Sequence, residues 1–446
     1  MKILLVNPPR SPENGILRYA PEQAKRFIHK KLIGPPLGLI TVAAAVRDFD
    51  VKVFDMKGEY DLAPDAPRLA DMTYDLIKRE RPDIVGVTFI ASEFDLGMEI
   101  FRQARRFDPK ILTVAGGLHV TLCPDDFAGG PVDVLCPGQS AHVFRELVMA
   151  REKGEPLDAV GGILLNRNGA LEQTKVPLKP RDPAGADFIM PDRSHLDRWV
   201  PTYTVGGSPD PATYVFTSLG CPYRCSFCSI WPLFEGRYCQ REVESVITEL
   251  KSIDRYPIVR FADANTIVGE QFMNALFDRI IEEGIRKTYV MDVRFDTAVK
   301  YPRLIEKLAK AGLKVVICGI ESFRQDELER YNKSSNAKLI EEAIRIFHAN
   351  DIMVRGNYVV PADYGVDDFA ALADYAGSHP VVYAGYTILT PMPGTVFYNE
   401  IRNEIVDHDL AKYNFFNCVL KTKLPIEEFY ERVGALWLIK KGTDVI

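Results

Sequence analysis

Short apolar runs alternate with longer amphipathic segments along the first third of the chain. The runs are rich in Val, Ile and Leu, which is typical of strands that are buried on both faces. They are Lys2–Val6, Val51–Phe54, Asp83–Phe89, Ile111–Ala115 and Val132–Leu135. The segments between them repeat apolar residues every three or four positions, as helices with one buried face do; they are Leu37–Arg47, Leu69–Arg79, Phe94–Phe107 and Ala141–Arg151. The alternation predicts a parallel sheet covered by helices.

The same alternation returns in the second half of the chain. Its predicted strands are Tyr214–Ser218, Ile258–Phe261, Tyr289–Val293, Val315–Ile320, Val354–Val360 and Gly385–Leu389. The helices expected between them are Val243–Ile253, Phe272–Glu283, Leu304–Ala311, Leu339–His348 and Phe369–Ala376. Six such units form either an open sheet or a partly closed barrel, and a barrel would place its catalytic residues at the carboxyl ends of the strands.

A break separates the two halves. The run from Gly161 to Gly169 predicts a small hairpin, and the stretch from Pro177 to Pro211 is rich in Pro, Asp and Gly, as surface linkers are. We therefore expect domains at 1–150 and 211–398, joined by a linker with a hairpin at 151–210. A short helical tail at 399–446 would follow, with one helix from about Leu424 to about Lys440.

Three cysteines, Cys221, Cys225 and Cys228, lie in one loop after the first strand of the second half, in the run LGCPYRCSFC. Three thiolates can bind three irons of a [4Fe–4S] cube and leave the fourth iron open. Zinc is the rival interpretation, but structural zinc takes four protein ligands, and no nearby Cys or His pair completes a set. All three thiols are therefore predicted metal ligands.

This CxxxCxxC loop at the start of a six-unit βα array resembles the radical S-adenosylmethionine (radical SAM) superfamily. The resemblance implies a partial (β/α)6 barrel in which the amino and carboxylate groups of S-adenosylmethionine chelate the open iron. It also implies that an electron from the cluster cleaves the sulfonium. The resulting 5′-deoxyadenosyl radical would abstract hydrogen from an unactivated carbon, which requires a site closed to water.

Further motifs match this superfamily. Phe227, before the last cysteine of the loop, would pack against the adenine. Glu321 and Ser322 end the fourth strand in a GIES run that is similar to a family motif for the ribose hydroxyls. Asp263, after the second strand, is placed where family members carry acidic residues facing the cofactor or substrate. Both Asp263 and Glu321 could instead cap helices.

Two arginines are further candidates for the S-adenosylmethionine site. Arg294, late in the third strand, could bind the carboxylate of the cofactor, or it could pair with Asp292 or Asp296 on the surface. Arg355 lies within the fifth strand, where a charge usually faces the barrel mouth for a purpose. The loop PMPGT, from Pro391 to Thr395, resembles the P-x-PGT loop of the family.

The first half resembles the cobalamin-binding domain of the B12-dependent radical SAM subclass, a Rossmann-like parallel sheet. The resemblance rests on the opening ILLVNPP, on GPPLGL from Gly34, on VAGGLH from Val114 and on CPGQS from Cys136. Glycines at strand ends let a flat macrocycle approach the backbone closely. The residues that the resemblance implies at the cobalamin side are Pro36, Leu37, Asp55, Met56, Lys57, Thr88, Ser92, Gly116, Gly117, His119, Gly138 and Gln139.

One position departs from the pattern of corrin proteins that supply a histidine to cobalt. Those proteins carry Asp-x-His-x-x-Gly after the second strand, whereas this chain has Asp55, Met56 and Lys57 there. A protonated ammonium has no lone pair for cobalt. We therefore expect cobalamin to bind without a protein imidazole on the metal, and the alternative is a Rossmann-like domain that holds no corrin.

Composition narrows the setting. The 446 residues include eight cysteines and carry a net charge of −6, so no broad basic surface is available for nucleic acid. No targeting segment or membrane span is visible, which predicts a cytoplasmic protein in which clustered cysteines bind metal before they form disulfides. The roles of Cys239, Cys318 and Cys418 stay open, and most scattered cysteines are expected to be buried hydrophobes.

The leading hypothesis is a B12-dependent radical SAM methyltransferase that acts on an unactivated carbon through methylcobalamin. A cyclisation, oxidation or rearrangement by the same radical step is the second hypothesis, and a non-catalytic iron–sulfur or corrin-binding regulator is the third. The expected substrate is a small molecule, such as a natural product, lipid or tetrapyrrole. The expected electron donor is a flavodoxin or ferredoxin.

Overall fold

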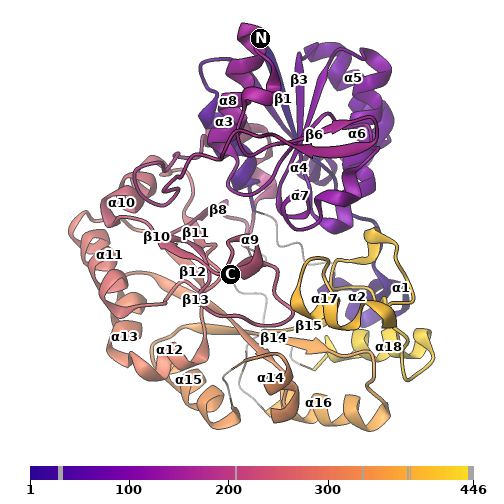
Figure 1. Ribbon diagram of the computed structural model, residues 1–446. Helices are drawn as coiled ribbons and strands as arrows, with labels where there is room; N and C mark the ends of the chain where they lie inside the picture. Colours follow the sequence, from indigo (N-terminus) through magenta and orange to yellow (C-terminus); the bar gives the residue numbers. More distant parts are fainter. Residues whose placement is uncertain (29–33, 206–207, 334–335, 379–380, 382, 440–446) are drawn as a thin grey trace. The chain divides into compact units, whose positions relative to one another are not determined.

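The computed structural model describes residues 1–28, 34–205, 208–333, 336–378, 381 and 383–439. The chain divides into two compact units, and Figure 1 shows the elements of each. The first unit contains residues 1–12 and 35–203, and the second contains residues 13–34 and 204–446. Residues 13–34 therefore belong to the second unit, although the sequence analysis assigned them to the first.

A seven-stranded sheet forms the centre of the first unit. Its strands are β1 (Lys2–Asn7), β2 (Asp50–Asp55), β3 (Ile84–Thr88), β4 (Leu112–Gly116), β5 (Val134–Cys136), β6 (Leu164–Arg167) and β7 (Ala170–Gln173), in the order β2-β1-β3-β4-β5-β6-β7. The first five run parallel, as predicted. The order reverses between β1 and β3, and ligands of doubly wound sheets bind at such a reversal.

The predicted hairpin exists, but it is part of this sheet. β6 and β7 pair with each other and β6 pairs with β5, both antiparallel. The sheet is therefore mixed at this edge, and the segment expected as a linker completes the first unit. The hairpin has this place because Val134 and Leu135 offer a free strand edge for Leu164 and Leu165 to join.

Helices cover the sheet of the first unit. They are α3 (Leu37–Ala45), α4 (Met56–Leu62), α5 (Leu69–Glu80), α6 (Phe94–Phe107), α7 (Leu118–Leu122) and α8 (Ala141–Lys153), with short 3₁₀ turns η1 (Ala91–Glu93) and η2 (Pro124–Phe127). Four of these helices match the apolar periodicity, and the short α4 and α7 were not predicted. Packed side chains of β1, β3 and β4 with α5 and α6 form a continuous core that includes Val85, Phe89 and Phe101. Burial of these apolar faces is the main stabilising term.

The second unit is built on a six-stranded parallel sheet. Its strands are β8 (Ala212–Val215), β11 (Ile258–Phe261), β12 (Thr288–Asp292), β13 (Leu313–Glu321), β14 (Met353–Val360) and β15 (Tyr383–Ile388), in the order β15-β14-β13-β12-β11-β8. β8 and β15 are the two edges and do not pair, so the sheet is an open (β/α)6 arrangement, as expected for a partial barrel. Figure 1 shows its helices outside the strands.

These helices include α10 (Val243–Ser252), α11 (Glu270–Glu282), α12 (Phe295–Lys300), α13 (Pro302–Lys310), α14 (Gln325–Arg330), α15 (Ala337–Ala349), α16 (Val366–Ser378) and α17 (Val396–Ile401). Five of them match the predicted ones, whereas the short α12, α14 and α17 were not predicted. Along the strands, one set of alternate residues packs against the helices and the other faces the inside of the curved sheet. Val290, Val315 and Ile317 belong to one apolar cluster on the inner side.

The tail packs on residues from the beginning of the chain. α18 (Ile426–Leu436) is the predicted tail helix, and its expected end near Lys440 lies outside the described residues. It contacts α1 (Gly15–Tyr19), where the rings of Tyr19 and Tyr430 stack with centroids 5.7 Å apart. A Cβ at Gly15 would lie 2.4 Å from the Tyr430 ring, so this contact requires glycine.

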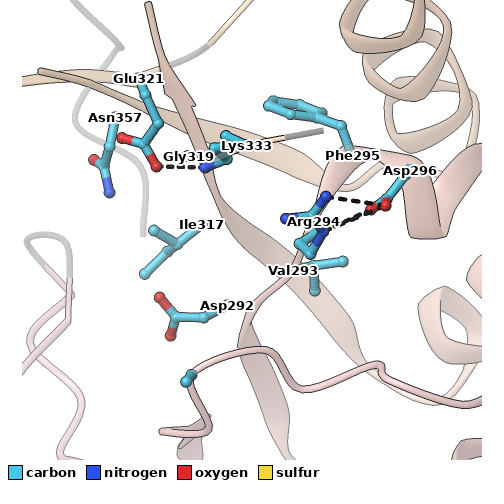
Figure 2. A pocket seen from close by; sticks show the side chains of 11 residues that line it. Asp292, Val293, Arg294, Phe295, Asp296, Ile317, Gly319, Glu321, Lys333 and Asn357 are labelled. Carbon is cyan, nitrogen blue, oxygen red and sulfur yellow. Dashed lines mark hydrogen bonds and ion pairs between the residues drawn. The ribbon is translucent and has the colours of Figure 1, made fainter. Parts of the chain in front are cut away.

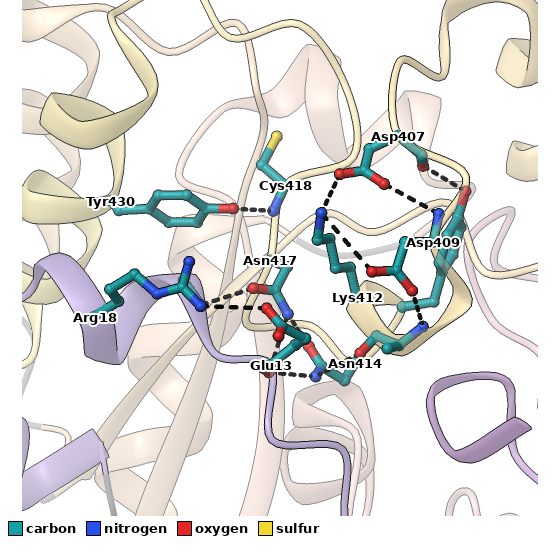
Figure 3. A network of polar contacts seen from close by, with 12 residues as sticks. Glu13, Arg18, Asp407, Asp409, Lys412, Asn414, Asn417, Cys418 and Tyr430 are labelled. Atoms are coloured by element: carbon teal, nitrogen blue, oxygen red, sulfur yellow. Dashed lines mark hydrogen bonds and ion pairs between the residues drawn. The ribbon is translucent and has the colours of Figure 1, made fainter. Parts of the chain in front are cut away.

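A buried asparagine fixes this contact, as Figure 3 shows. Asn417 is only 3% exposed, and its Oδ1 accepts the Gly15 N–H at 2.7 Å. Its Nδ2 donates to the Glu13 carbonyl at 3.1 Å and to Asn414 Oδ1 at 2.8 Å. The amide therefore satisfies buried backbone groups of a segment about 400 residues away in the chain.

We predict that Asn417→Ala loosens this contact. Loss of the side chain leaves the buried Gly15 N–H unpaired, which costs about 1–3 kcal/mol. Hydrogen–deuterium exchange of the peptide that covers Gly15 to Tyr19 should accelerate accordingly. The control is Asn403→Ala, at an exposed position. Equal exchange in the two variants would show that the asparagine does not hold the segment.

Candidate functional site

A small hairpin brackets the cysteine loop. After β8 the chain forms β9 (Ser218–Gly220), then the loop with the three cysteines and α9 (Ile230–Leu233), and returns as β10 (Tyr238–Gln240), antiparallel to β9. The sequence analysis missed this hairpin because its strands have three residues each. Gly220 has φ +81°, and a Cβ there would lie 2.0 Å from the Arg237 carbonyl oxygen, so only glycine fits at the base of the loop.

Two buried charged side chains hold the backbone that leads into this loop. Asp263, at the end of β11, is 3% exposed, and its Oδ1 accepts the N–H of Thr217 at 2.9 Å, the N–H of Ser218 and the Ser218 hydroxyl at 2.7 Å. Arg241 donates to the Phe216 carbonyl at 2.6 Å. The loop therefore starts from a fixed platform.

Burial raises the pKa of the Asp263 carboxyl to about 7, and the hydrogen bonds from Ser218 and Thr217 oppose this rise. Asp263 was predicted to face the cofactor or substrate. The structure shows a different task, because its bonds go to the backbone beneath the cysteine loop. Contact with a ligand remains a prediction for this residue.

The three thiols are half-buried and free of disulfides. Burial raises the pKa of Cys228 to about 11; the hydrogen bond from the Ile230 N–H opposes this rise, and the charges of Cys225 and Cys221 reinforce it. Cys228 Sγ accepts the Ile230 N–H at 3.4 Å. Hydrogen bonds of this type tune the potential of iron–sulfur clusters.

The number of thiols favours a cluster over a single zinc ion. Structural zinc takes four protein ligands, whereas three thiolates bind three irons of a cube and leave the fourth iron open. The donor set of this loop therefore fits [4Fe–4S].

A cavity of about 220 Å³ opens inside the second unit. Figure 2 shows its polar side chains, which include Arg294, Asp296, Glu321, Lys333 and Asn357, and residues of β12, β13 and β14 contribute to the lining. The lining residues are Ala264, Asp292, Val293, Arg294, Phe295, Asp296, Ile317, Gly319, Glu321, Lys333 and Asn357. Arg294 and Glu321, both predicted for S-adenosylmethionine, are thus brought together in one pocket.

Arg294 links this pocket to the cysteine loop. Its guanidinium lies 4.0 Å from the ring centroid of Tyr223, between the first two cysteines, and Nε is 3.1 Å from Asp296 Oδ1. Its charge lowers the pKa of Cys225 and Cys221 against the larger effect of burial. Of the two acidic partners considered for Arg294, Asp296 pairs with it, whereas Asp292 pairs with Arg260.

Glu321 is held in an unusual conformation. Its φ is +64°, which costs a non-glycine residue about 1–3 kcal/mol. Its carboxylate forms a close ion pair with Lys333, and the pair lies against Gly319, where a Cβ would meet Glu321 Oε1 at 2.0 Å. The β13–β14 register shifts between Gly319 and Glu321. Strain of this type is retained where a site needs a particular side-chain direction.

The remaining predicted residues of the second unit lie outside the pocket lining. Phe227 packs edge-on against Tyr331, with centroids 5.5 Å apart. Ser322 is buried, and its hydroxyl donates to Glu327. Arg355 pairs in register with Ile317 on β13. Their contacts with S-adenosylmethionine stay predictions.

The three cysteines with open roles all differ in position. Cys239 lies on β10 opposite Leu219, Cys318 is fully buried within β13, and Cys418 is buried with its N–H bonded to Tyr430. None of them lines the pocket.

Sequence reasoning missed several pocket residues. Asp292 lines the pocket and forms a bidentate ion pair at 2.8–3.0 Å with Arg260 on the neighbouring strand, and Asn357 lines the pocket from β14. The signal was present, because each interrupts an apolar strand at alternate positions that share one face. Lys333 gave no such signal, since it follows α14 in a turn and only the tertiary fold brings it to Glu321.

In the first unit, a hydrogen-bond network joins the ends of β1 and β2 at the reversal of strand order. Asp55 is fully buried, and its carboxylate accepts the Asn7 Nδ2–H at 2.7 Å, the Tyr203 hydroxyl at 2.7 Å and the Lys57 N–H at 3.2 Å. The last bond caps α4. Asp55 thus orients the backbone that carries Lys57, and its predicted contact with cobalamin stays a prediction.

Lys57 is held by an acidic partner that the sequence analysis did not identify. Its Nζ lies 2.6 Å from Glu93 Oε1, in η1. Burial raises the pKa of Glu93, and the Lys57 ammonium opposes this rise. The pairing keeps the nitrogen of Lys57 engaged with a carboxylate, so it is a poor candidate for a cobalt ligand.

Several other residues predicted at the cobalamin side lie at the carboxyl ends of the neighbouring strands β3, β4 and β5. Gly117 has φ +102°, and a Cβ there would lie 2.7 Å from Thr88 Oγ1, so the β3 and β4 ends approach closely. Gly138 has φ +70° and open space where a Cβ would be. This space suits a flat ligand against the backbone. Met56, Ser92 and His119 are buried, Leu37 starts α3 after Pro36, Gly116 is partly exposed, and Gln139 is exposed.

Comparison with protein families matches both units. Residues 215–376 match the Radical SAM superfamily, and residues 27–148 match the B12 binding domain. No helix among the described residues is long and apolar enough to cross a membrane.

Individual relatives share both parts. An uncharacterised methyltransferase of Pyrococcus horikoshii is 29% identical over 440 residues, which cover 95% of this chain and 88% of that protein. The hopanoid C-3 methylase of Methylococcus capsulatus is 24% identical, over 89% of this chain and 74% of its own. The solved structure of the radical S-adenosylmethionine methyltransferase TsrM from Kitasatospora setae has a TM-score of 0.71 at 19% identity, over 97% of this chain and 85% of its own.

The two matched domains stand in the order that the motifs predicted, with the three cysteines at the start of the second match and the strand-end glycines inside the first. The pocket beside the cysteine loop is polar and partly charged, as a site for an amino acid cofactor must be. The chain therefore belongs to the radical S-adenosylmethionine enzymes that carry a B12-binding domain.

Proposed function

We propose that the protein is a cobalamin-dependent radical S-adenosylmethionine methyltransferase that methylates an unactivated carbon of a small molecule. The observation that carries this proposal is the pairing of a three-thiol loop beside a charged pocket with a B12-binding sheet in one chain. Relatives that align with 95% and 89% of this chain are a methyltransferase and a methylase by name, which favours methyl transfer. An anaerobic magnesium-protoporphyrin IX monomethyl ester cyclase of Rubrivivax gelatinosus, which aligns with 79% of the chain, keeps cyclisation as the second candidate.

The residues of the second unit divide the work of the site. Cys221, Cys225 and Cys228 would hold the [4Fe–4S] cluster, and the pocket would hold S-adenosylmethionine. When bound, the cluster supplies the electron that cleaves S-adenosylmethionine, and cobalamin supplies a carrier for the methyl group. Arg294 and Lys333 are the cationic groups of the pocket that suit the cofactor carboxylate, and Glu321 is the acidic group that suits its ammonium or ribose hydroxyls.

To bind the carboxylate of S-adenosylmethionine, a cationic group of the pocket must share its charge between this ligand and its acidic neighbour. Arg294 pairs with Asp296, and Lys333 pairs with Glu321. A carboxylate ligand that reaches either cation gains a charge-assisted hydrogen bond without leaving a buried charge unpaired, because each neighbour remains nearby. The pocket is thus organised for a zwitterionic ligand before it binds.

The electron donor and the compartment are also proposals. All eight cysteines are free thiols, which suits a reducing, cytoplasmic environment. A small electron-transfer protein of the flavodoxin or ferredoxin class would supply low-potential electrons, and the net charge of −6 argues against nucleic acid as a partner.

Methyl transfer is tested with methyl-labelled S-adenosylmethionine. We expect anaerobically reconstituted, reduced and cobalamin-loaded protein to form 5′-deoxyadenosine and to place the label on its cobalamin. Cells that express the protein should contain a labelled small molecule that cells with the Cys225→Ala variant lack. 5′-Deoxyadenosine without labelled cobalamin would instead support a cyclisation, oxidation or rearrangement, and neither product would support a non-catalytic role.

We predict that Cys225→Ala abolishes the visible absorbance of the reconstituted cluster, because two thiolates hold a cube poorly. The matched control is Cys239→Ala, which removes a thiol from β10 and is expected to leave cluster iron and absorbance unchanged. Equal iron content in the two variants would refute the assignment of the three ligands.

The pairing of Lys57 predicts the coordination of cobalt. In cobalamin-loaded protein, the electron paramagnetic resonance spectrum of Co(II) should show no splitting from an axial nitrogen of the protein, because the Lys57 ammonium is engaged by Glu93. Lys57→Met, which removes the ammonium, should leave this spectrum unchanged. Nitrogen splitting in the unmodified protein that disappears in Lys57→Met would overturn the prediction.

A further inference from the structure

A second group of metal-ligating side chains lies in the first unit. His119, Cys123 and Asp126 each offer one ligand atom, and these atoms all lie within 4.8 Å of one another. They come from neither the cysteine loop nor the pocket, and neither family match explains why a thiol, an imidazole and a carboxylate meet here. The cluster therefore needs its own account.

The local fold brings the three residues together. His119 and Cys123 are four residues apart on the single turn of α7 and its end, so their side chains share one face. The Cys123 N–H donates to the His119 carbonyl at 2.8 Å, and the Asp126 N–H donates to the Cys123 carbonyl at 3.3 Å. The backbone thus fixes the spacing of the three ligand atoms.

The imidazole gives the independent observation. His119 is 3% exposed, and its Nε2 is buried without a hydrogen-bond partner. The Asp126 Oδ2 lies 2.9 Å from this nitrogen as an ion-pair partner, so the buried nitrogen faces a carboxylate of the same group. A cation bound between them would satisfy both atoms.

Aromatic side chains pack around the imidazole of His119. The ring of His119 lies edge-on to Phe94, with centroids 5.5 Å apart, and tilted to Phe127 at 5.7 Å. Both phenylalanines are close to the main core of the unit. These rings fix the orientation of the imidazole and leave its Nε2 directed toward Cys123 and Asp126. Cys123 is partly exposed, and Asp126 is exposed.

We propose that His119, Cys123 and Asp126 bind Zn²⁺. Thiolate, imidazole and carboxylate are the three protein donors that zinc accepts, and a mixed set of this kind suits zinc better than magnesium or calcium. Three protein ligands leave the fourth position for water or another small ligand. The ion would tie α7 to η2, beside the Gly116 and Gly117 strand end. This site does not depend on the proposed methyl transfer.

The test uses the full-length chain with its iron–sulfur cluster reconstituted under anaerobic conditions. One equivalent of Zn²⁺ should remain after a wash with a weak chelator, and X-ray absorption at the zinc edge should show one sulfur with nitrogen and oxygen ligands. Competition with a chromophoric chelator should show that Cys123→Ser and Asp126→Asn each weaken zinc binding at least about tenfold. Cys136→Ala, a buried thiol outside the group, is the matched control.

Asp126 is exposed, so its substitution is expected to leave folding intact, and iron content and the unfolding temperature check this for every variant. Loss of all zinc from the unmodified chain in the wash would overturn the proposal. Unweakened binding in both variants would do the same, as would a zinc edge with several sulfur ligands, which would place the ion in the cysteine loop.

Discussion

The position of the cysteine loop depends on a pair of buried charged groups beneath it. Asp263 accepts three hydrogen bonds from Thr217 and Ser218, and Arg241 donates to the Phe216 carbonyl while it pairs with Glu249 at 2.5 Å. A buried ion pair such as that between Arg241 and Glu249 adds little stability over an apolar alternative but specifies one geometry. Here the hydrogen bonds fix the backbone of residues 216–218, which leads from β8 toward the loop that carries the three cysteines.

The inner face of the six-stranded sheet shows why the pocket could form next to that loop. Apolar residues fill its lower part, where Val290 and Val315 meet, while Asp292, Lys333 and Asn357 line the cavity above them. Each cation has an acidic neighbour, so the charges are tolerated in a partly buried space. Arg294 and Lys333 are each paired with a carboxylate and still line the cavity, where a zwitterionic ligand can reach them.

The first unit applies the same device at the end of a different sheet. Lys57 stands where some corrin proteins have histidine, and Glu93 holds its ammonium. A neutral imidazole would offer cobalt a lone pair, whereas a paired ammonium offers a charge and no lone pair. Glycines at the neighbouring strand ends, Gly117 and Gly138, leave the backbone accessible in the same region.

The sequence by itself determined the main strands and helices. Strand and helix periodicity placed both parallel sheets, and the spacing of Cys221, Cys225 and Cys228 predicted the cluster loop, because these signals are local in the chain. Tertiary structure alone decided which distant residues meet. It brought Glu13 and Gly15 to the tail through Asn417, joined the 164–173 hairpin to the first sheet, and placed Lys333 on Glu321. Such partners depend on long-range packing, which no single segment encodes.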